Sequence, residues 1–457
     1  MLTYKRLLAA SSAIVLGAGS GFATSVLAQV PNSSGTTQST TPSGAARAGD
    51  TTGGMNITSR AESNFARDRN ITVMQRPREG YEARGVRAGT FLVFPKIALT
   101  AEHNDNIYAR DDNEIDDNII RIAPEVTFNS DWNRHQVFGY ARAIVNQFQD
   151  NEDENTTDWL VGVAGRLDVS RDTRVNGRFD WSHLTEPRTA PGAPQSALEP
   201  VQYDLRAVAL GFQHEFNRLM VAGRFDARTF EYDNPPRQGG GTVDQSFRDR
   251  TVTTLGGRAD YAVSPATAFF VDLSTNKHEY DRGASATNIN RDSDGYQALV
   301  GVNFELGAVT RGEIGVGYLS QSFDDPSHGD IDGFGARAQL EWFPTQLTTV
   351  TLTGTRTIED SPVPGAAGYL STNLGARVDH ELLRNVILSG YAGWGNDDYE
   401  NIGREDRRNT LGVSATYLLN RNVGLTVSFD RSKQDTRRGA GNDFEQNRVG
   451  ATLTAQF

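Results

Sequence analysis

The chain has 457 residues, of which 37% are hydrophobic and 46 are glycine, and its mean hydropathy is -0.49. Its formal net charge is -12 and its pI is about 5.2, which argues against nucleic acid as a partner, because phosphate binding needs a basic surface. The chain contains no cysteine, so disulfides and thiolate metal sites are excluded. These totals indicate a chain of globular size that is poor in aliphatic runs.

The first 28 residues have the three parts of a secretory signal peptide. Lys5 and Arg6 precede an apolar stretch of small residues, and the sequence VLA at 26–28 forms a small-residue cleavage site. A buried N-terminal helix is the competing interpretation, but it does not account for the three features together. We therefore predict cleavage after Ala28 and export of the remaining chain.

Residues 29–90 contain no clear periodic element. Residues 29–54 are rich in Ser, Thr and Gly and cannot bury enough apolar surface to offset their ordering entropy, so we predict a disordered periplasmic segment. Residues 55–90 are less biased but show no helical period. The sequence leaves open whether 29–90 is a low-complexity linker throughout or whether 55–90 plugs the domain that follows.

Residues 91–457 alternate apolar and polar side chains in one segment after another, without a convincing amphipathic helix. After the signal peptide no run of about 18 apolar residues follows, so we expect no transmembrane helix. Tight breaks such as 129–135 and 168–175 alternate with long hydrophilic breaks such as 233–249 and 396–408. Short turns on one side and long loops on the other are typical of an outer-membrane barrel.

The length of the segments separates a membrane barrel from a soluble β-sandwich or propeller, which also alternates. Soluble strands average about 5 to 6 residues, whereas these segments run to about 12 to 15, enough to cross a bilayer when tilted. We predict an all-β, transmembrane, antiparallel up-and-down β-barrel at 91–457. The pattern indicates about 18 strands, with 16 to 20 open, and an even number places both ends on the periplasmic side.

A five-residue motif recurs within the strands as AGRLD, NGRFD, AGRFD, GGRAD and GARVD, beginning at residues 164, 176, 222, 256 and 375. Its Arg and Asp share one face of a strand, and this face points to the lumen if the apolar neighbours face lipid. We expect cross-strand ion pairs in a wet wall, each contributing roughly 0.2 to 1 kcal/mol. A compatible alternative is that they line a conduit for a polar or charged solute. The lumen-facing candidates are Arg166, Asp168, Arg178, Asp180, Arg224, Asp226, Arg258, Asp260, Arg377 and Asp379.

The sequence predicts no catalytic, cofactor or metal site. Its seven histidines are scattered, and neither a GxSxG elbow nor an HExxH metal motif occurs. Residues 292–295 have the spacing that begins a calcium loop but lack the downstream bidentate Glu, so we interpret the acidic loops as a solvated outer surface. We therefore predict a protein that is not an enzyme.

The final residues, ATLTAQF, alternate like a strand. This segment resembles the recognition strand used by the barrel-assembly machinery of Gram-negative bacteria, and it must also pair with the first strand, which begins near Val93, to close the sheet edge. Its last aromatic residue is expected in the periplasmic aromatic girdle. The apolar face of this strand consists of Val449, Ala451, Leu453, Ala455 and Phe457.

Two short motifs begin the predicted barrel. A GTF lead at 89–91 and Pro95 precede the sequence EHNDN at 102–106, and Pro124 precedes SDW and RH in the next segment. With these motifs, residues 80–457 resemble the putative beta-barrel porin 2 family, although His103 stands where an aromatic or apolar residue is expected. We expect the Asn/Asp cluster to hold the first external loop by hydrogen bonds to the backbone, rather than to bind a ligand. The matching motif residues are Asn104, Asp105, Asn106, Pro124 and Trp132.

The resemblance implies an outer-membrane barrel of a Gram-negative bacterium, in a family often linked with exopolysaccharide synthesis and export. It transfers no active site and no cofactor. The leading hypothesis is a porin-like barrel that supports export or surface handling of exopolysaccharide, or passage of polar solutes. The alternatives are a docking barrel that anchors a periplasmic export complex, and a general diffusion porin. The expected partners are outer-membrane lipid, the barrel-assembly machinery, polysaccharide export proteins and polysaccharide; the sequence does not indicate an oligomeric state.

Overall fold

The structure is a computed structural model that describes residues 71–281, 290–307, 309–363, 365–439 and 441–457. The predicted signal peptide and the predicted linker up to residue 70 lie outside the described residues. Helical structure within these ranges consists of three single 3₁₀ turns, η1 (Val73–Gln75), η2 (Glu152–Glu154) and η3 (Ser246–Arg248). No helix in the described ranges is long and apolar enough to cross a membrane.

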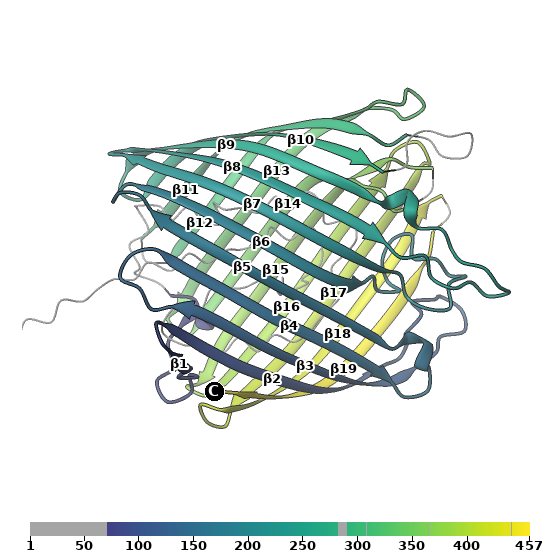
Figure 1. Ribbon diagram of the computed structural model, residues 1–457, viewed down its shortest axis with the longest axis horizontal. Helices are drawn as coiled ribbons and strands as arrows, with labels where there is room; N and C mark the ends of the chain where they lie inside the picture. Colours follow the sequence, from purple (N-terminus) through teal and green to yellow (C-terminus); the bar gives the residue numbers. More distant parts are fainter. Residues whose placement is uncertain (1–70, 282–289, 308, 364, 440) are drawn as a thin grey trace, which may run out of the picture.

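Eighteen antiparallel strands, β2 to β19, form a closed barrel (Figure 1). Each strand pairs with the next one along the chain, and β19 pairs with β2, which closes the ring. The predicted barrel with 18 strands is therefore confirmed. The strands are β2 (Phe91–Asn104), β3 (Asp117–Ser130), β4 (Gln136–Phe148), β5 (Thr156–Asp168), β6 (Thr173–Thr185), β7 (Gln202–Phe216), β8 (Leu219–Tyr232), β9 (Arg250–Ser264), β10 (Thr267–Tyr280), β11 (Ser293–Leu306), β12 (Thr310–Phe323), β13 (Ile331–Thr345), β14 (Thr348–Asp360), β15 (Gly368–Leu383), β16 (Val386–Tyr399), β17 (Arg404–Leu418), β18 (Val423–Arg438) and β19 (Phe444–Gln456).

The strands are strongly tilted (Figure 1). A path that follows paired residues from strand to strand once around the ring returns to β2 about 22 residues from its starting point. For 18 strands this shift corresponds to a strand tilt of about 40°. Long connections such as 186–201 and 233–249 lie at one end, called here the loop end. Short connections such as 217–218 lie at the other, the turn end, together with residues 71–90 and Phe457.

A short strand, β1 (Val86–Ala88), extends the seam where the barrel closes. Strand β19 pairs with β2 from Lys96 to Asn104, and β1 pairs with the remaining turn-end part of β2. Phe457 lies at the junction, where its N–H donates to the carbonyl of Pro95 at 3.1 Å and its carbonyl accepts from the N–H of Gly85 at 3.3 Å. The backbone of Phe457 is therefore bonded to both β2 and the segment that leads into β1.

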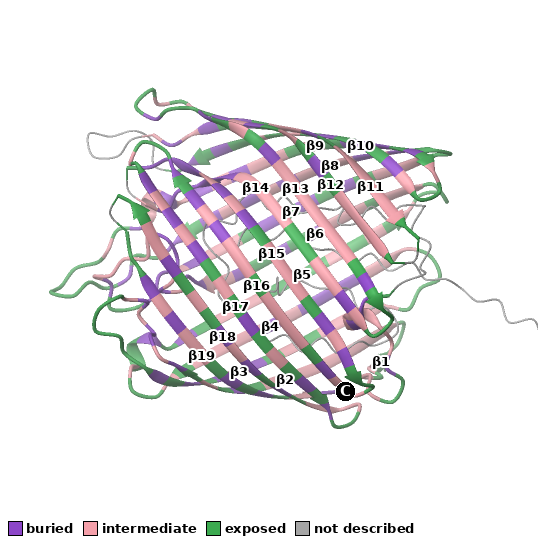
Figure 2. Ribbon diagram, turned by 180° about the vertical axis from the view of Figure 1, so that it is seen from behind, coloured by how far each residue is buried: buried purple, intermediate pink, exposed green. Residues whose placement is uncertain are grey.

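Exposed and buried residues alternate along the strands (Figure 2), and many of the exposed side chains on the strands are large and apolar, whereas many of the buried ones are polar or charged. On β19, Val449 and Leu453 are 52% and 48% exposed, whereas Thr452 between them is 4% exposed. Thr452 faces inward and shares a 2.8 Å hydrogen bond with Thr100 on β2. The hydroxyl pair occupies the inner face because a lipid-facing hydroxyl would lack a partner.

The ladder between β13 and β14 is incomplete at the loop end. It begins only at the pair Ala336 and Arg356, although β14 continues to Asp360 and stays paired with β15 to its last residue. Beyond that point the β14–β15 hairpin folds inward. A Cβ atom added to Gly368, the first residue of β15, would lie 2.8 Å from the side chain of Ile331 on β13. The end of the hairpin therefore passes beneath the inner face of β13, while β15 stays paired with β16 up to Tyr369 and Tyr399.

Candidate functional site

The Arg/Asp motifs lie on the strands, and most of their side chains pair within their own strand. The ion pair spans 2.6 Å from Arg178 to Asp180 and 2.7 Å from Arg258 to Asp260. These four side chains are at most 8% exposed. Positions i and i+2 lie about 7 Å apart on one strand face, which the long Arg side chain bridges easily. Two further motif pairs at the turn half of the barrel also pair in this way, at 3.2 Å and 2.9 Å: Arg166 with Asp168, and Arg377 with Asp379.

The motif on β8 differs from the other four. Arg224 reaches two strands away to Asp272 on β10 at 2.6 Å, and Asp226 pairs instead with Arg228 at 2.9 Å. Cross-strand pairing, which was expected for all five motifs, occurs at Arg224 and also at Arg258, which pairs both with Asp260 on its own strand and with Glu313 of β12. In the other three motifs the ion pair runs along the strand.

Arg258 belongs to a larger network on the inner wall. Its guanidinium donates to both oxygens of Asp260 and, across the lumen side of β10 and β11, to both oxygens of Glu313 on β12. Glu313 also accepts from Arg337 of β13 at 2.9 Å. The Arg258 guanidinium lies 3.9 Å from the centre of the Phe270 ring, which adds a cation–π contact. This network ties β9, β12 and β13 together at mid-height of the barrel.

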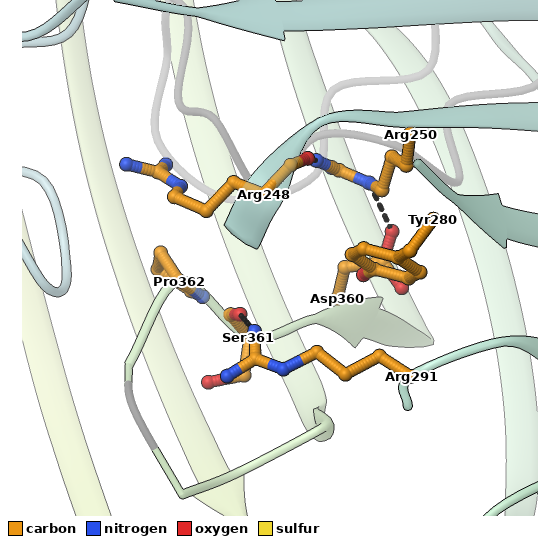
Figure 3. Close-up of a pocket in the computed structure, with 7 residues that line it drawn as sticks. All are labelled: Arg248, Arg250, Tyr280, Arg291, Asp360, Ser361 and Pro362. Atoms are coloured by element: carbon orange, nitrogen blue, oxygen red, sulfur yellow. Dashed lines mark hydrogen bonds and ion pairs between the residues drawn. The ribbon is translucent and has the colours of Figure 1, made fainter. Parts of the chain in front are cut away.

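A second charged group lies at the loop end and is called here the arginine cluster: Arg248, Arg250 and Arg291 (Figure 3). Arg248 binds Glu186 through two hydrogen bonds of 2.8 Å, and Arg250 donates to Asp360 at 2.8 Å. The three guanidinium groups face two carboxylates, so the cluster carries one excess positive charge. All five side chains are below 10% exposed.

Asp360 reaches the cluster from the inward-folded end of β14, and four strands separate β14 from β9, which carries Arg250. Its second oxygen is 2.8 Å from Nδ1 of His278 on β10. The neighbouring Ser361 accepts a 3.1 Å hydrogen bond from Arg291 through its carbonyl. The space between these side chains is too narrow for a water molecule. The tip of β14 therefore fills the cluster.

Burial and neighbouring charges shift the ionisation of the loop-end groups. Burial lowers the pKa of Arg291; Tyr280 and Asp360 act against this shift, and the guanidinium groups of Arg250 and Arg248 add to it. Burial opposes the charge of Arg248 as well, but the Glu186 carboxylate outweighs it and raises the pKa of Arg248. Burial, followed by the charge of Arg291, lowers the pKa of His328 in the β12–β13 loop. The loop end thus holds buried arginines whose charge is opposed by burial and supported by neighbouring carboxylates.

The long loops near the cluster are joined to one another. Arg188 in the β6–β7 loop binds Glu154 in the β4–β5 loop at 3.1 Å, and the N–H of Leu198 donates to Pro236 in the β8–β9 loop. The Glu186 carboxylate that binds Arg248 comes from the same β6–β7 loop. These contacts hold the loops on one side of the arginine cluster in place.

The N-terminal part of the described chain contacts the inner wall at the turn end. The N–H of Val73, a fully buried residue, donates to the Thr349 hydroxyl of β14 at 2.9 Å. Arg78 is 2% exposed and lies 3.6 Å from the Glu381 carboxylate of β15. Residues 73–78 therefore occupy part of the lumen entrance beside β14 and β15.

The Asn/Asp cluster lies where β2 ends and the first long loop begins. Asn104 accepts from the N–H of Asn106 at 3.0 Å, and Asn106 in turn donates to the Glu445 carbonyl at 2.9 Å. Both oxygens of Asp105 accept from Asn447, through its backbone and its side chain. The three side chains thus fasten the loop to β19, beside the closing seam.

Trp132, Pro124 and the apolar face of the last strand are the remaining residues predicted from the sequence, and they lie apart from one another. Trp132 is in a turn with its ring 5.6 Å from that of Phe91, and Pro124 interrupts the ladder between β3 and β4. On β19 the predicted apolar face has Phe457 at 57% exposure, with Ala451 exposed and Ala455 half-buried. No group of three or more His, Asp or Glu side chains in the described ranges is arranged to hold a metal ion.

Sequence reasoning missed the arginine cluster, Asp360 and the docked Arg78. A signal for the cluster does exist, because Arg248 and Arg250 flank the point where a long polar loop turns into a strand. Arg291 and Asp360 stand at similar boundaries. Charged residues at the loop ends of several strands come together only if a segment folds into the barrel. The alternation pattern does not indicate which segment does so.

Comparison with known proteins supports the barrel family. The model of the family described as putative beta-barrel porin 2 matches residues 78–457, which confirms the resemblance seen in the entry motifs. No curated protein matches the chain.

Several solved structures are similar at low identity. OccK2 (OpdF) of Pseudomonas aeruginosa is 10% identical, with a TM-score of 0.45 over 80% of this chain and 98% of that one. OccAB3 of Acinetobacter baumannii is 13% identical, with a TM-score of 0.44 over 81% and 100%. A mutant ferric enterobactin receptor, PfeA of P. aeruginosa, is 8% identical, with a TM-score of 0.44 over 83% and 84%. These likenesses are too distant to add to what the hydrogen-bond ladders establish.

Proposed function

This chain belongs to the putative beta-barrel porin 2 family, and from that premise we propose that it is a non-enzymatic outer-membrane pore for polar solutes. The observation that carries the proposal is the inner wall. Arg178, Asp180, Arg258 and Asp260 are buried from bulk solvent yet charged and paired, on the opposite face from the apolar belt. A charged wall of this kind requires a hydrated or polar interior, because unpaired charge in an apolar space is costly.

Handling of exopolysaccharide is the more specific role that we propose for this pore. Hydroxyl-rich polymers need a wall that offers hydrogen-bond donors and acceptors of both kinds, and the mixed Arg/Asp pairs supply both. Pairing also keeps the wall from strongly preferring one sign of ion. The partners of such a role are outer-membrane lipid around the apolar belt, the barrel-assembly machinery during insertion, and polysaccharide export proteins on the periplasmic side.

A docking barrel that anchors an export complex is the second candidate, and residues 73–78 favour it. They lie against the inner wall at the turn end, through Thr349 and Glu381, and narrow the entrance there. A barrel whose entrance stays blocked would act as an anchor and not as a pathway.

Liposome swelling with neutral sugars of increasing size separates these functions. Entry of small sugars with a size limit supports the pore, and the absence of swelling by a correctly folded barrel refutes it in favour of the anchor. For the polysaccharide role, deletion of the gene should reduce surface polysaccharide. Unchanged surface polysaccharide would remove that role while leaving passage of small solutes standing.

A further inference from the structure

We propose that a strip of four side chains on the outer face of the barrel binds the bisphosphorylated disaccharide headgroup of lipopolysaccharide in the outer leaflet. These side chains, called here the outer strip, belong to Arg356, Thr372, Asn396 and Arg407. The outer strip crosses the adjacent strands β14 to β17 (Figure 2), with one residue on each strand. The proposal needs the outer-membrane location that the proposed function assumes, and it adds a lipid partner without requiring an open pore.

The register of the ladders places the four residues side by side. Thr372 lies opposite Arg356 on one side and opposite Asn396 on the other. Asn396 in turn lies opposite Arg407. Residues that lie directly opposite each other point to the same face of a sheet. This face is the outer one, because Leu374, two positions after Thr372, is 55% exposed.

The outer strip lies at the border between the apolar belt and the loop end. Toward the loops, β14 ends four residues after Arg356, and β17 begins three residues before Arg407. Toward the turns, Leu374 is exposed, and the ring of Trp394 lies 5.9 Å from the Arg407 guanidinium. Aromatic side chains mark the interfaces of such a barrel, and its longer loops are extracellular. The outer strip therefore faces the headgroup region of the outer leaflet, where lipopolysaccharide lies.

Arg356 and Arg407 differ from other basic residues of the outer face in having no acidic partner. Arg206, Lys277 and Arg431 each lie within 3.1 Å of a carboxylate oxygen. Among the residues that the structure describes, no carboxylate lies within 4.0 Å of the Arg356 or Arg407 guanidinium. The Nε atom of each is also buried without a hydrogen-bond partner in that part of the chain.

Carboxylates beside the outer strip leave its charge largely unsatisfied. The acidic residues that lie next to it in the described wall are Asp398, Glu405 and Asp435. Two of them bind other basic residues, at 3.4 Å and 3.0 Å: Glu405 with Arg438, and Asp435 with Lys433. Asp398 is exposed and offsets at most one of the two positive charges. Because an arginine on a lipid-facing wall is costly without a counter-ion, the outer strip calls for an anionic group from the membrane.

The spacing of the two arginines fits a headgroup with two phosphates. Three strand spacings separate Arg356 from Arg407, which is roughly 14 Å. The phosphates of lipid A stand at the two ends of a glucosamine disaccharide of comparable length, whereas a glycerophospholipid such as phosphatidylglycerol carries one phosphate. Each guanidinium can bind one phosphate through charge-assisted hydrogen bonds, and the long Arg side chain can reach up to the headgroup level.

The residues between the arginines suit the sugar, and those below suit the acyl chains. The Thr372 hydroxyl accepts a 2.8 Å hydrogen bond from Arg356, which holds this guanidinium in the outer strip. The same hydroxyl can still donate, and the Asn396 amide can both donate and accept. On the turn side, Leu352 and Leu374 are 44% and 55% exposed and offer an apolar surface to acyl chains.

Titration of the purified, lipid-free barrel in detergent micelles tests the lipid class without any substitution. Bisphosphorylated lipid A is the probe, and monophosphoryl lipid A and phosphatidylglycerol are the comparison lipids with one phosphate each. The first should bind about tenfold more tightly than either of the others, because it engages both guanidinium groups. Equal affinity for all three would assign the outer strip to anionic lipids in general and overturn the proposal.

Substitution of both arginines tests the site itself. Arg356→Gln combined with Arg407→Gln should weaken lipid A binding about tenfold, and each change alone several-fold. The matched control combines Arg206→Gln with Lys277→Gln, which removes two outer-face charges that already have carboxylate partners and should leave the affinity unchanged. Heat-modifiable migration in dodecyl sulfate gels verifies that each protein is folded. Equal losses in the two double variants would show that binding follows total charge and would refute the site.

Liposome swelling keeps the lipid site and the pore apart. A folded barrel that prefers bisphosphorylated lipid A but admits no sugar would retain the lipid site and lose the proposed pore. A barrel that admits sugars but binds the three lipids equally would retain the pore and lose the lipid site.

Discussion

The guanidinium of Arg78 lies 3.6 Å from the carboxylate of Glu381, and this contact joins a segment that precedes the barrel to the inner face of β15. Both side chains are below 5% exposed, and Arg76 lies 3.5 Å from the same carboxylate. Burial lowers the pKa of Arg78, and the charge of Glu381 is the strongest influence in the opposite direction. The contact is thus the main electrostatic anchor of this segment in the lumen.

We predict that Glu381→Gln releases residues 73–78 and raises the rate of liposome swelling in neutral sugars several-fold. The physical reason is that removing one member of a buried ion pair costs about 3 to 5 kcal/mol and leaves two arginines without their counter-ion. Glu313→Gln is the control, because it removes an equivalent charge from the wall without touching the segment. Equal swelling of both variants and the unaltered protein would show that the segment does not limit passage.

A second prediction concerns Phe457 and assembly of the barrel. Phe457→Asp should lower the amount of heat-modifiable barrel in outer-membrane fractions, whereas Phe457→Tyr should not. The backbone contacts of this residue with Pro95 and Gly85 do not depend on the side chain, and a charge near the interface costs only about 1 kcal/mol or less in the folded barrel. Refolding yield in detergent should therefore be unchanged. A variant that assembles normally in cells would remove the proposed role of the terminal strand in recognition.

The barrel was predictable because apolar and polar residues alternate along a strand with a period of two. This alternation can be recognised in the sequence of each strand alone. Phe179, Arg178 and Asp180 illustrate this, since an aromatic residue between two charged ones is 43% exposed while its neighbours are buried. The identity of ion-pair partners was less predictable. Whether Arg224 binds Asp226 or Asp272 depends on the register of β8, β9 and β10, which local spacing does not contain.

The inward position of the β14–β15 tip was not predictable from its residues. The alternation from Leu352 to Ile358 is the same whether the strand stays in the wall or folds beneath β13, because Ile358 is buried from water in both places. Asp360 meets Arg250 across 110 positions of sequence, and no motif surrounds either residue. Only the arrangement of the loops brings the two together.

A third prediction concerns the mid-barrel network around Arg258. Arg258→Met should lower the temperature at which the barrel unfolds in dodecyl sulfate, since Asp260 and Glu313 lose a fully buried partner at a cost of about 3 to 5 kcal/mol. The matched control is Arg206→Met, whose partner Glu231 is exposed on the outer rim, with an expected cost of about 1 kcal/mol or less. Adding Asp260→Asn to the first variant should recover part of the loss. Equal effects of Arg258→Met and Arg206→Met would show that the network does not stabilise the barrel.

A fourth prediction follows from His328, which is buried in the β12–β13 loop with its ring 5.7 Å from that of Phe323. Its pKa is lowered, first by burial and then by Arg291, so the folded loop resists a proton that the unfolded loop accepts. The stabilising difference is complete above the ordinary histidine pKa of about 6.5 and is lost as the pH falls through the lower value of the folded loop.

Hydrogen exchange of the amides in 324–330 should therefore accelerate as the pH falls from neutral toward acid, after correction for the intrinsic pH dependence of exchange. His328→Gln should remove this acceleration, because glutamine has a similar polarity and does not titrate. The adjacent Asp325 acts in the same direction, since its hydrogen bonds from Ser327 lower its pKa, but a carboxyl group titrates at a more acidic pH than an imidazole. An acceleration that persists in His328→Gln with its midpoint near neutral pH would assign the effect to another group.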